Sequence, residues 1–440
     1  MYKEIELRIT PEEAQDREIV NELLAKMLHV SKERIVHVEI LRKSIDARQR
    51  RVVIQLRVGV HLDRVEQKER VFVPQYRDVS SAETVVVVGA GPAGLFAALR
   101  LIELGKRPIV LERGKCVEER KLDLNRLYKT GVANEDSNYG FGEGGAGTFS
   151  DGKLFTRSKK RGNVDRILEI LVYHGANPNI LIDAHPHIGT DKLPQVIVNM
   201  RKTIEKYGGE VRFNSQMYDM NIRSMPGGAA LSSILIKQID DEVKHCGEET
   251  MECGPVVLAL GHSARDTFRM LSAKGICMQQ KPFSIGVRIE HPQELIDRAQ
   301  YGAPAGELGL APADYKINHR CHNGRGVYNF CMCPGGEVIV ASSQEGGVVT
   351  NGMSYRDRAS GAANSALLCD VRVTDFGSED VLAGVEFQEK YERLAFQNGG
   401  GNYHAPKSTW GRLRDSKAPE VEGSLPEFAA QAFREAMPHL

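Results

Sequence analysis

The chain has 440 residues, which is enough for two or three domains that each bury a core. Lysine plus arginine and aspartate plus glutamate both number 58, so the formal net charge is zero. A zero net charge excludes an overall electrostatic attraction to nucleic acid or to an acidic membrane, and we expect neither as a partner. We interpret the basic run at residues 157–161 as a solvated loop in preference to a phosphate-binding patch.

The expected compartment follows from the cysteines and from the first residues. The eight cysteines are irregularly spaced, unlike the framework of a small disulfide-bonded secreted domain. The start, MYKEIELRIT, has acidic residues where a signal peptide would have a basic region and an apolar core. Residues 85–102 approach the length of a membrane span, but a glycine loop and Arg100 divide them into strand, turn and helix. We therefore expect a soluble, cytoplasmic protein with reduced thiols.

Residues 1–78 are the first expected domain. Alternating apolar and polar residues predict three strands, and helical spacing after Thr10, a candidate N-cap, predicts one helix. In chain order these elements occupy residues 2–9, 11–28, 35–41 and 51–58. The expected fold is a small α+β domain of β-α-β-β order, ferredoxin-like, which we interpret as a docking or recognition domain.

Residues 82–280 carry the pattern of a nucleotide-binding α/β domain. The apolar run 85–88 predicts a strand buried in a parallel sheet, and GAGPAG at 89–94 leads from it into a helix. The other expected elements are helices 95–104 and 193–206 and strands 108–111, 210–213 and 255–260. This order predicts a Rossmann-type domain.

Each glycine of the first loop has a physical role. Gly89 permits a tight turn, Gly91 lets the backbone approach a pyrophosphate, and Gly94 lets the helix pack close to the sheet. Pro92 and Ala93 lie in the first turn of the helix, whose free N–H groups and positive dipole end favour phosphate. The loop therefore predicts dinucleotide binding.

An acidic residue follows the second strand at about the 20-residue offset typical of this motif. Glu112 is placed to accept hydrogen bonds from the ribose hydroxyls, and its charge disfavours a 2′-phosphate. Arg113 beside it weakens the second argument. The loop alone thus leaves FAD and NAD open.

A second glycine-rich stretch, FGEGGAGTFSDGKLF, spans residues 141–155. Glycine costs chain entropy on folding, so this density predicts a close backbone approach to a second part of the ligand. Lys153 would place a cation near a flavin ring or a substrate anion. The candidates for holding phosphate or ribityl oxygens are Gly145, Gly147, Thr148 and Ser150. A flexible surface loop is the alternative.

Several motifs together resemble one bacterial family. They are GAGPAG with the following Glu-Arg pair, GGAGTFSDGKL, LALGHSARDT at 258–267, NFCMCPGG at 329–336 and NGMS at 351–354. Over nearly its whole length the chain is similar to proteins called FAD-dependent dehydrogenases or NAD(P)/FAD-dependent oxidoreductases.

The resemblance implies extended FAD in a nucleotide fold of the glutathione-reductase type, with an inserted α+β substrate-type domain at 281–415. Gly89, Gly91 and Gly94 would meet the pyrophosphate and Glu112 the ribose. The backbone of Val211 would contact the adenine. The residues implied beside the nucleotide, at the end of a buried strand, are Ala259, Leu260 and Gly261.

A bound flavin carries out hydride chemistry itself, so the sequence requires no acid–base pair and names no catalytic residue. His262 is interpreted equally as a cofactor contact and as a helix cap. Arg265 and Asp266 are interpreted as a local ion pair in preference to an anion site. For Cys331 and Cys333 we favour buried or turn-lining thiols over a redox dithiol. We expect no metal site.

The sequence departs from the family in one respect. The family carries a Gly-Glu-Gly-Ala-Gly run in a final segment that returns to the first domain, and no such run follows Gly411. We interpret residues 416–440 as the truncated start of that return. Weak or absent FAD binding is then expected, unless a partner supplies the missing surface.

These patterns favour an FAD-dependent oxidoreductase that acts on a small molecule, with NAD(P)H as a candidate electron donor. One alternative is a non-catalytic flavin-fold protein that binds a nucleotide or a partner. A second is a tRNA-modifying flavoprotein, which would need a local positive patch because the net charge is zero.

Overall fold

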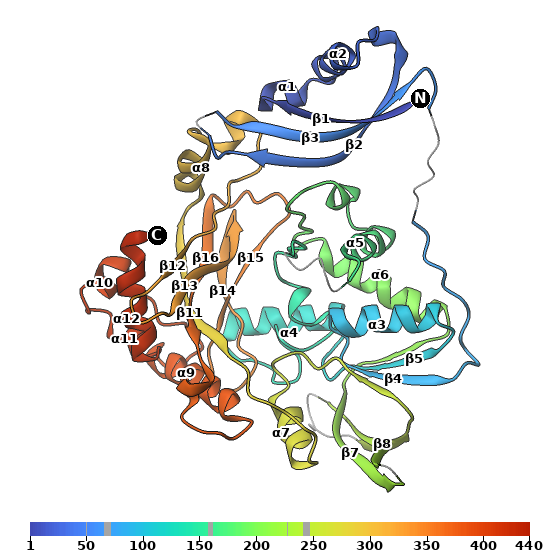
Figure 1. The fold of residues 1–440 in the computed structure, drawn as a ribbon. Coiled ribbons are helices and arrows are strands. Elements are labelled where there is room, and N and C mark those ends of the chain that lie inside the picture. The colour runs from blue at the N-terminus through green and yellow to red at the C-terminus, as the bar shows by residue number, and fades with distance from the viewer. Residues whose placement is uncertain (50, 66–71, 157–161, 227, 241–246) are drawn as a thin grey trace.

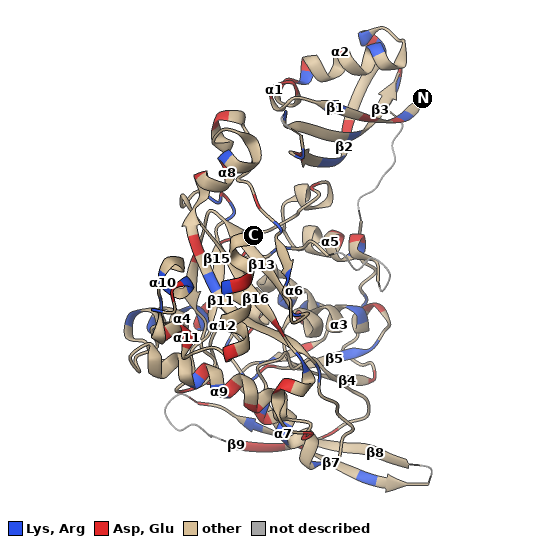
Figure 2. Cartoon of the chain, turned by 60° about the vertical axis from the view of Figure 1, so that its left-hand side comes forward, with Lys and Arg blue, Asp and Glu red and all other residues tan. Residues whose placement is uncertain are grey.

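The computed structural model describes residues 1–49, 51–65, 72–156, 162–226, 228–240 and 247–440 (Figure 1). The basic run at 157–161 lies outside these ranges. Within the described residues, no helix is long and apolar enough to cross a membrane. Lysine and arginine are interspersed with aspartate and glutamate over the elements of all three regions (Figure 2).

The N-terminal region has the predicted β-α-β-β order. Its elements are β1 (Tyr2–Ile9), α1 (Pro11–Gln15), α2 (Arg17–Leu28), the 3-10 turn η1 (Lys32–Arg34), β2 (Ile35–Asp46) and β3 (Val53–Leu62). They form an antiparallel sheet of order β1-β3-β2. Thr10 caps α1 as predicted, accepting a hydrogen bond from the Glu13 N–H. The expected single helix is broken at Asp16, because its carboxylate caps a second helix instead.

The second region is built on a four-stranded parallel sheet of order β10-β4-β5-β6. The elements that lead up to its fourth strand are β4 (Thr84–Val88), α3 (Pro92–Glu103), β5 (Arg107–Leu111), α4 (Val117–Thr130), η2 (Gly145–Gly147), α5 (Val164–Tyr173), η3 (Pro178–Leu181), α6 (Leu193–Lys206) and β6 (Glu210–Arg212). An antiparallel sheet follows, made of β7 (Ser215–Met225), β8 (Gly228–Gln238) and β9 (Gly247–Glu252). The last elements of the region are β10 (Val256–Leu258), which belongs to the parallel sheet, and the helix α7 (Arg265–Ala273). The predicted elements are present, with ends that differ from the predicted ones by up to three residues.

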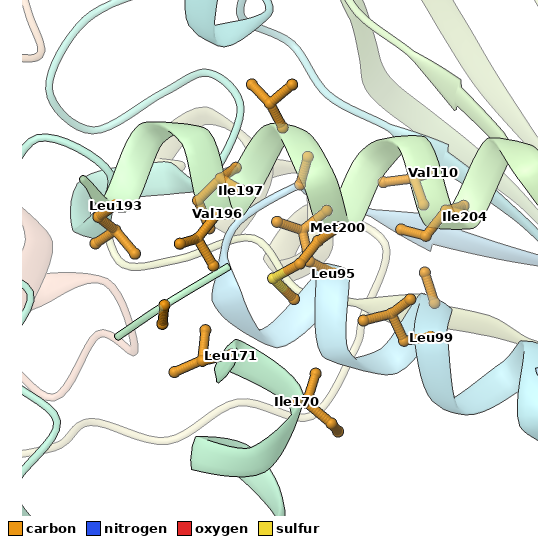
Figure 3. Packing of buried hydrophobic residues seen from close by; sticks show 14 of the residues in the cluster. Leu95, Leu99, Val110, Ile170, Leu171, Leu193, Val196, Ile197, Met200 and Ile204 are labelled. Carbon is orange, nitrogen blue, oxygen red and sulfur yellow. The ribbon is translucent and has the colours of Figure 1, made fainter. Parts of the chain in front are cut away.

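The core of this region lies between the parallel sheet and its helices (Figure 3). Leu95 and Leu99 of α3 pack with Met200 and Ile204 of α6, and all four are at most 1% exposed. Their helical spacing puts them on one face of each helix. β10 differs from the expected buried strand: it lies at the edge of the sheet, and Leu258 is 42% exposed.

The third region contains an antiparallel sheet of order β11-β16-β13-β12 and a separate β14-β15 pair. Its first elements are β11 (Phe283–Pro292), α8 (Gln293–Tyr301), η4 (Ala305–Leu308), β12 (Asn318–Arg320), β13 (Gly326–Pro334), β14 (Gly336–Val340), β15 (Thr350–Ser354) and β16 (Ala362–Val371). They are followed by η5 (Val373–Phe376), α9 (Ala383–Asn398), α10 (Trp410–Arg414), α11 (Pro419–Glu422), α12 (Glu427–Ala436) and η6 (Met437–His439).

The last helices pack on the sheet of the third region. Phe433 of α12 is fully buried and shares a core with Val327 of β13 and Leu367 of β16. We expected residues 416–440 to begin a return to the nucleotide-binding sheet. In the structure they cover the antiparallel sheet instead, because the apolar face of α12 is buried there (Figure 1).

The N-terminal domain contacts both other regions. The Lys43 N–H of β2 donates to the Ile182 carbonyl at 2.9 Å, and the Ala184 N–H donates to the Lys43 carbonyl at 3.0 Å. Leu310, which follows η4, packs against the core of the N-terminal sheet. The N-terminal domain is thus joined to the second region by backbone pairing at β2 and to the third by apolar contact with its core.

Candidate functional site

The first glycine loop has no room for side chains at two of its three glycines. Gly89 has a φ of +103°, and a Cβ there would lie 2.3 Å from the Ala259 carbonyl oxygen. A Cβ at Gly94 would lie 1.8 Å from the Gly89 carbonyl oxygen. Both glycines are therefore needed to let β4, α3 and the β10 end meet closely, as predicted.

Gly91 differs from these two glycines. It has a φ of −69°, and a Cβ there would meet only the Gly145 Cα, at 3.9 Å. It is the N-cap of α3, where no side chain caps the helix, and Pro92 and Ala93 in the next turn are exposed. The first turn of a helix leaves backbone N–H groups without intrahelical partners, and because Pro92 has no N–H, the donors next to the open space at Gly91 are those of Ala93 and Gly94. This is the arrangement that a pyrophosphate requires.

The second glycine-rich stretch lies directly against the first loop. The Gly144 N–H donates to the Ala90 carbonyl at 2.8 Å. A Cβ at Gly145 would lie 3.1 Å from the Gly91 Cα, and one at Gly147 would lie 3.7 Å from Pro92 Cγ. The structure thus brings together two segments that the sequence treated as two parts of one ligand site.

Glu112 organises this junction. Its carboxylate is 5% exposed and accepts hydrogen bonds from the N–H groups of Ala90 at 2.8 Å, Gly114 at 3.0 Å and Gly142 at 2.9 Å. A carboxylate has about four acceptor positions, so three are taken by the backbone. Sequence reasoning assigned Glu112 to the ribose alone and missed that it ties the two glycine stretches together.

Two predicted ligand hydroxyls bond to the chain itself. Thr148 is fully buried, and its hydroxyl donates to the Glu143 carbonyl at 2.8 Å. The Ser150 hydroxyl donates to the Gly147 carbonyl at 2.7 Å. The expectation that Thr148 holds a ligand oxygen is therefore corrected, because its side chain points into the loop that it stabilises.

A buried arginine that sequence reasoning missed holds the start of the second stretch. Arg120 of α4 is 0% exposed and donates to the carbonyls of Asn138 at 2.8 Å, Tyr139 at 3.1 Å and Glu143 at 2.7 Å. Burial lowers the pKa of Arg120 to about 10, although Glu112 and Glu143 oppose this. A single arginine in a polar helix carries no sequence signal for such a role.

The Glu143 side chain also anchors the start of the second glycine-rich stretch to neighbouring elements. It accepts from the Val117 N–H at 2.8 Å and forms an ion pair with Arg201 of α6 at 2.8 Å. Burial raises the pKa of Glu143, although these two partners oppose the rise. The glycine-rich stretch is therefore a fixed part of the site rather than a flexible surface loop.

The residues expected beside the nucleotide on the β10 side are near the first loop. The Ala259 N–H donates to the Val88 carbonyl at 2.8 Å. Gly261 has a φ of +71° and has nothing within 4 Å of an added Cβ, and His262 is exposed. Of the two equal interpretations of His262, the helix cap is wrong, since α7 begins at Arg265 without a side-chain cap. On the other side of the sheet, Val211 lies in β6 and pairs with Val110.

Arg113, Arg265 and Asp266 have distant partners. Arg265 is 3% exposed and forms an ion pair with Glu392 of α9 at 2.6 Å. Asp266 is paired with Arg113 and accepts from Gln216 at 2.5 Å. The expected local Arg265–Asp266 pair is therefore corrected, because each side chain meets a partner from another element.

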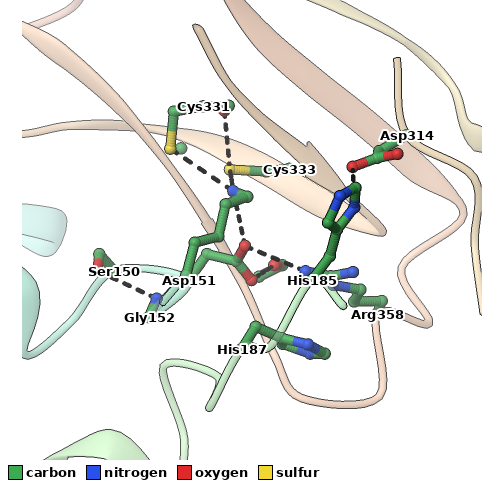
Figure 4. A network of polar contacts seen from close by, with 12 residues as sticks. Ser150, Asp151, Gly152, His185, His187, Asp314, Cys331, Cys333 and Arg358 are labelled. Atoms are coloured by element: carbon green, nitrogen blue, oxygen red, sulfur yellow. Dashed lines mark hydrogen bonds and ion pairs between the residues drawn. The ribbon is translucent and has the colours of Figure 1, made fainter. Parts of the chain in front are cut away.

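Lys153 links the second glycine stretch to the third region through Asp151, Cys331 and Cys333, three residues that lie close together in Figure 4. Its Nζ lies 2.6 Å from Asp151 Oδ2, 3.5 Å from Cys331 Sγ and 3.2 Å from Cys333 Sγ. Asp151 is 1% exposed and also contacts Arg358, at 3.4 Å. Burial would raise the pKa of Asp151, but Lys153 and Arg358 lower it below the ordinary value. Lys153, which we expected to place its cation near a flavin ring or a substrate anion, thus contacts a carboxylate and two sulfurs.

Metal ligation is not indicated by the described residues, among which no three His, Cys, Asp or Glu side chains are grouped for a metal ion. The cysteine pair lies inside β13 rather than in a turn. Cys321 is separate from it, since its thiol faces the Ala432 carbonyl of α12 at 3.7 Å.

Known proteins agree with a flavin-binding assignment. Residues 84–118 match an FAD binding domain, residues 282–440 match "FAD-dependent protein, C-terminal domain-like", and residues 1–61 match a domain of unknown function. An uncharacterized protein of Clostridium beijerinckii is 40% identical over 439 residues, which cover 96% of this chain and 79% of that protein.

The solved structures that match include THI4 of Thermovibrio ammonificans, at 18% identity over 46% of this chain and 67% of that one, with a TM-score of 0.31. The anhydrotetracycline hydroxylase OxyS of Streptomyces rimosus is 15% identical over 67% of this chain and 47% of that one, with a TM-score of 0.28. The glycine cradle at the N-terminus of α3 fits a dinucleotide, and Gly91 on its α3 side falls within the matched FAD binding domain, whereas Gly145 lies beyond it. The chain therefore belongs to the same family as the Clostridium protein, a family of FAD-dependent proteins, and FAD is its cofactor.

Proposed function

We propose that this protein is an FAD-dependent oxidoreductase that transfers a hydride between FAD and a small-molecule substrate, with NADH or NADPH as the electron donor. The observation that carries the proposal is the open glycine cradle between Gly91 and Gly145 at the N-terminus of α3. FAD, when bound, supplies the hydride chemistry, and the protein supplies orientation and charge.

The chain's own residues have distinct parts in this proposal. The N–H groups of Ala93 and Gly94 at the start of α3 bind the pyrophosphate, because the first helical turn leaves its donors without intrahelical partners at the positive end of the helix dipole. Glu112 offers its remaining acceptor position to a ribose hydroxyl while it holds the loop. Arg120 keeps the second stretch against the first by its three carbonyl contacts.

A glycine substitution tests the position of the pyrophosphate. In Gly91→Ala the backbone keeps a φ that any residue adopts, and the added methyl group has no close neighbour, so we expect the fold to be retained. The methyl group would block the approach of a phosphate. We expect FAD affinity to fall at least about tenfold, which corresponds to roughly 1.4 kcal/mol. The measurement is a titration with FAD followed by the flavin absorption spectrum. Gly411→Ala is the matched control, since nothing lies within 4 Å of its added Cβ.

Reduction tests the oxidoreductase activity itself. The spectrum is recorded for the protein as purified and after FAD addition, then under anaerobic conditions with NADH and with NADPH. We expect the flavin absorption to bleach with at least one donor. Equal FAD affinity in Gly91→Ala and the wild type would contradict the cradle, and a bound flavin that neither donor bleaches would contradict the proposed donor. The titration also measures how tightly the wild-type chain binds FAD.

A further inference from the structure

The Cys331-Met332-Cys333 segment is not used by the proposed flavin site. It lies in β13, and both sulfurs contact the Nζ of Lys153, at 3.5 and 3.2 Å (Figure 4). In this segment the backbone departs from a regular strand. Phe330 pairs with Ala366 and Cys333 with Asn364, so β13 has one residue more than β16 over this interval.

That extra residue is accommodated by a bulge at Cys331, which has a φ of +49°. Only a few per cent of non-glycine residues have such a conformation, and it turns the chain sharply. The Cys333 thiol donates to the Cys331 carbonyl oxygen at 3.3 Å, and both sulfurs contact the same Lys153 Nζ. The bulge therefore keeps the two sulfurs next to each other.

Exposure and charge distinguish the two thiols. Cys331 is half-buried, whereas Cys333 is 0% exposed. The groups that face Cys331 are the Cys333 thiol, Lys153 and Arg288, and they lower the pKa of Cys331 to about 5 against the effect of burial. The neighbouring Cys331 side chain, burial and the Asp151 charge raise the pKa of the Cys333 thiol, although Lys153 opposes this. An accessible thiolate next to a buried protonated thiol is the arrangement of a dithiol exchange site.

We propose that Cys331 and Cys333 form a redox-active dithiol that reduces accessible disulfide compounds of the form R–S–S–R. Lys153 holds the attacking thiolate. This activity goes beyond the flavin reaction and does not depend on it.

The electron balance is that of thiol–disulfide exchange. The Cys331 thiolate attacks one sulfur of R–S–S–R, an S–S bond to Cys331 forms, and RS⁻ leaves and takes a proton from water. Cys333 loses its proton to water and attacks the Cys331 sulfur, which expels the second RS⁻. One protein disulfide forms, the substrate disulfide becomes two thiols, and two electrons pass from protein to substrate.

The experiment uses the full chain, reduced and freed of reductant, with oxidised glutathione as the probe. Intact mass and peptide mapping follow the products over time. In the wild type we expect a Cys331–Cys333 disulfide and release of two glutathione molecules. Cys333→Ser should stop at a mixed disulfide on Cys331, and Cys331→Ser should not react at Cys333. Cys277→Ser, which removes an exposed cysteine elsewhere, should form the same disulfide as the wild type.

A second measurement tests the role of Lys153 without a cysteine substitution. The rate of Cys331 alkylation by iodoacetamide is measured against pH in the wild type and in Lys153→Met. We expect the inflection to move to higher pH in the variant and the rate at pH 7 to fall several-fold, because thiolate is the reacting form.

Two results would overturn the proposal. One is a wild-type protein in which glutathione stays on Cys331 as stably as in Cys333→Ser, and the other is a Cys331 that does not react in the folded chain. Because mass is the readout, FAD-free and FAD-loaded protein give the same answer, and a failure of the flavin proposal is recognised separately.

Discussion

Glu112 is a single buried carboxylate on which two loops depend. In Glu112→Gln the side chain keeps one oxygen for Gly114 and Gly142, but its NH₂ group faces the Ala90 N–H, which loses its acceptor. A buried donor without a partner costs about 1–3 kcal/mol. We expect the free energy of unfolding to fall by about that amount, as measured by urea denaturation at pH 7.

The matched control for this residue is Glu205→Gln on α6, where the glutamate is exposed. A surface change of this kind is expected to stay within about 0.5 kcal/mol. Equal losses in the two variants would show that the three backbone contacts of Glu112 contribute nothing to stability.

At the scale of elements, one ion pair joins α7 of the second region to α9 of the third. Arg265 is 3% exposed and Glu392 is 17% exposed, so the two partners are not equivalent. Glu392→Leu leaves a buried guanidinium uncompensated, which costs about 3–5 kcal/mol. Arg265→Leu leaves a carboxylate that reaches water, and its effect on unfolding should be smaller.

Urea denaturation of both variants measures this asymmetry. Arg298→Leu is the control, because Arg298 forms an exposed pair with Glu294 one helical turn away in α8 and such pairs contribute only about 0.3–0.5 kcal/mol. If Arg265→Leu destabilised the protein more than Glu392→Leu, the argument from burial would be wrong.

At the scale of the whole molecule, the N-terminal domain is held by backbone pairing at Lys43 and by apolar contact at Leu310. Leu310→Asp would place a charge against the buried face of the N-terminal sheet, which costs free energy unless the domain moves away. We expect limited proteolysis to separate residues 1–62 from the rest faster than in the wild type, with FAD affinity unchanged.

Leu295→Asp on α8 is the control for this change, since Leu295 is 59% exposed. Gel analysis of timed digests gives the cleavage rates. Equal rates in the two variants and the wild type would show that the contact at Leu310 does not hold the domain.

The nucleotide-binding elements were predictable because their signals are local. The helix predicted over 193–206 is α6, and the strand predicted over 85–88 lies within β4. The helix is indicated by its apolar spacing and by a glycine after its end, and the strand by a continuous valine run. Each of these signals lies within a few residues of the element that it specifies. The break at Asp16 was missed, since a capping side chain in mid-pattern overrode the apolar period.

The sequence by itself determined the first glycine loop, its place after β4 and the FAD-dependent family, whereas the cradle between Gly91 and Gly145 forms only in the folded chain. Tertiary structure alone decided which side chains meet across distance. Arg265 bonds a residue of α9 instead of its neighbour Asp266, and Lys153 meets Cys331 and Cys333 from another region. The physical reason is that conformational preferences act over a few residues, whereas burial and charge pairing depend on which surfaces the packed elements present to one another.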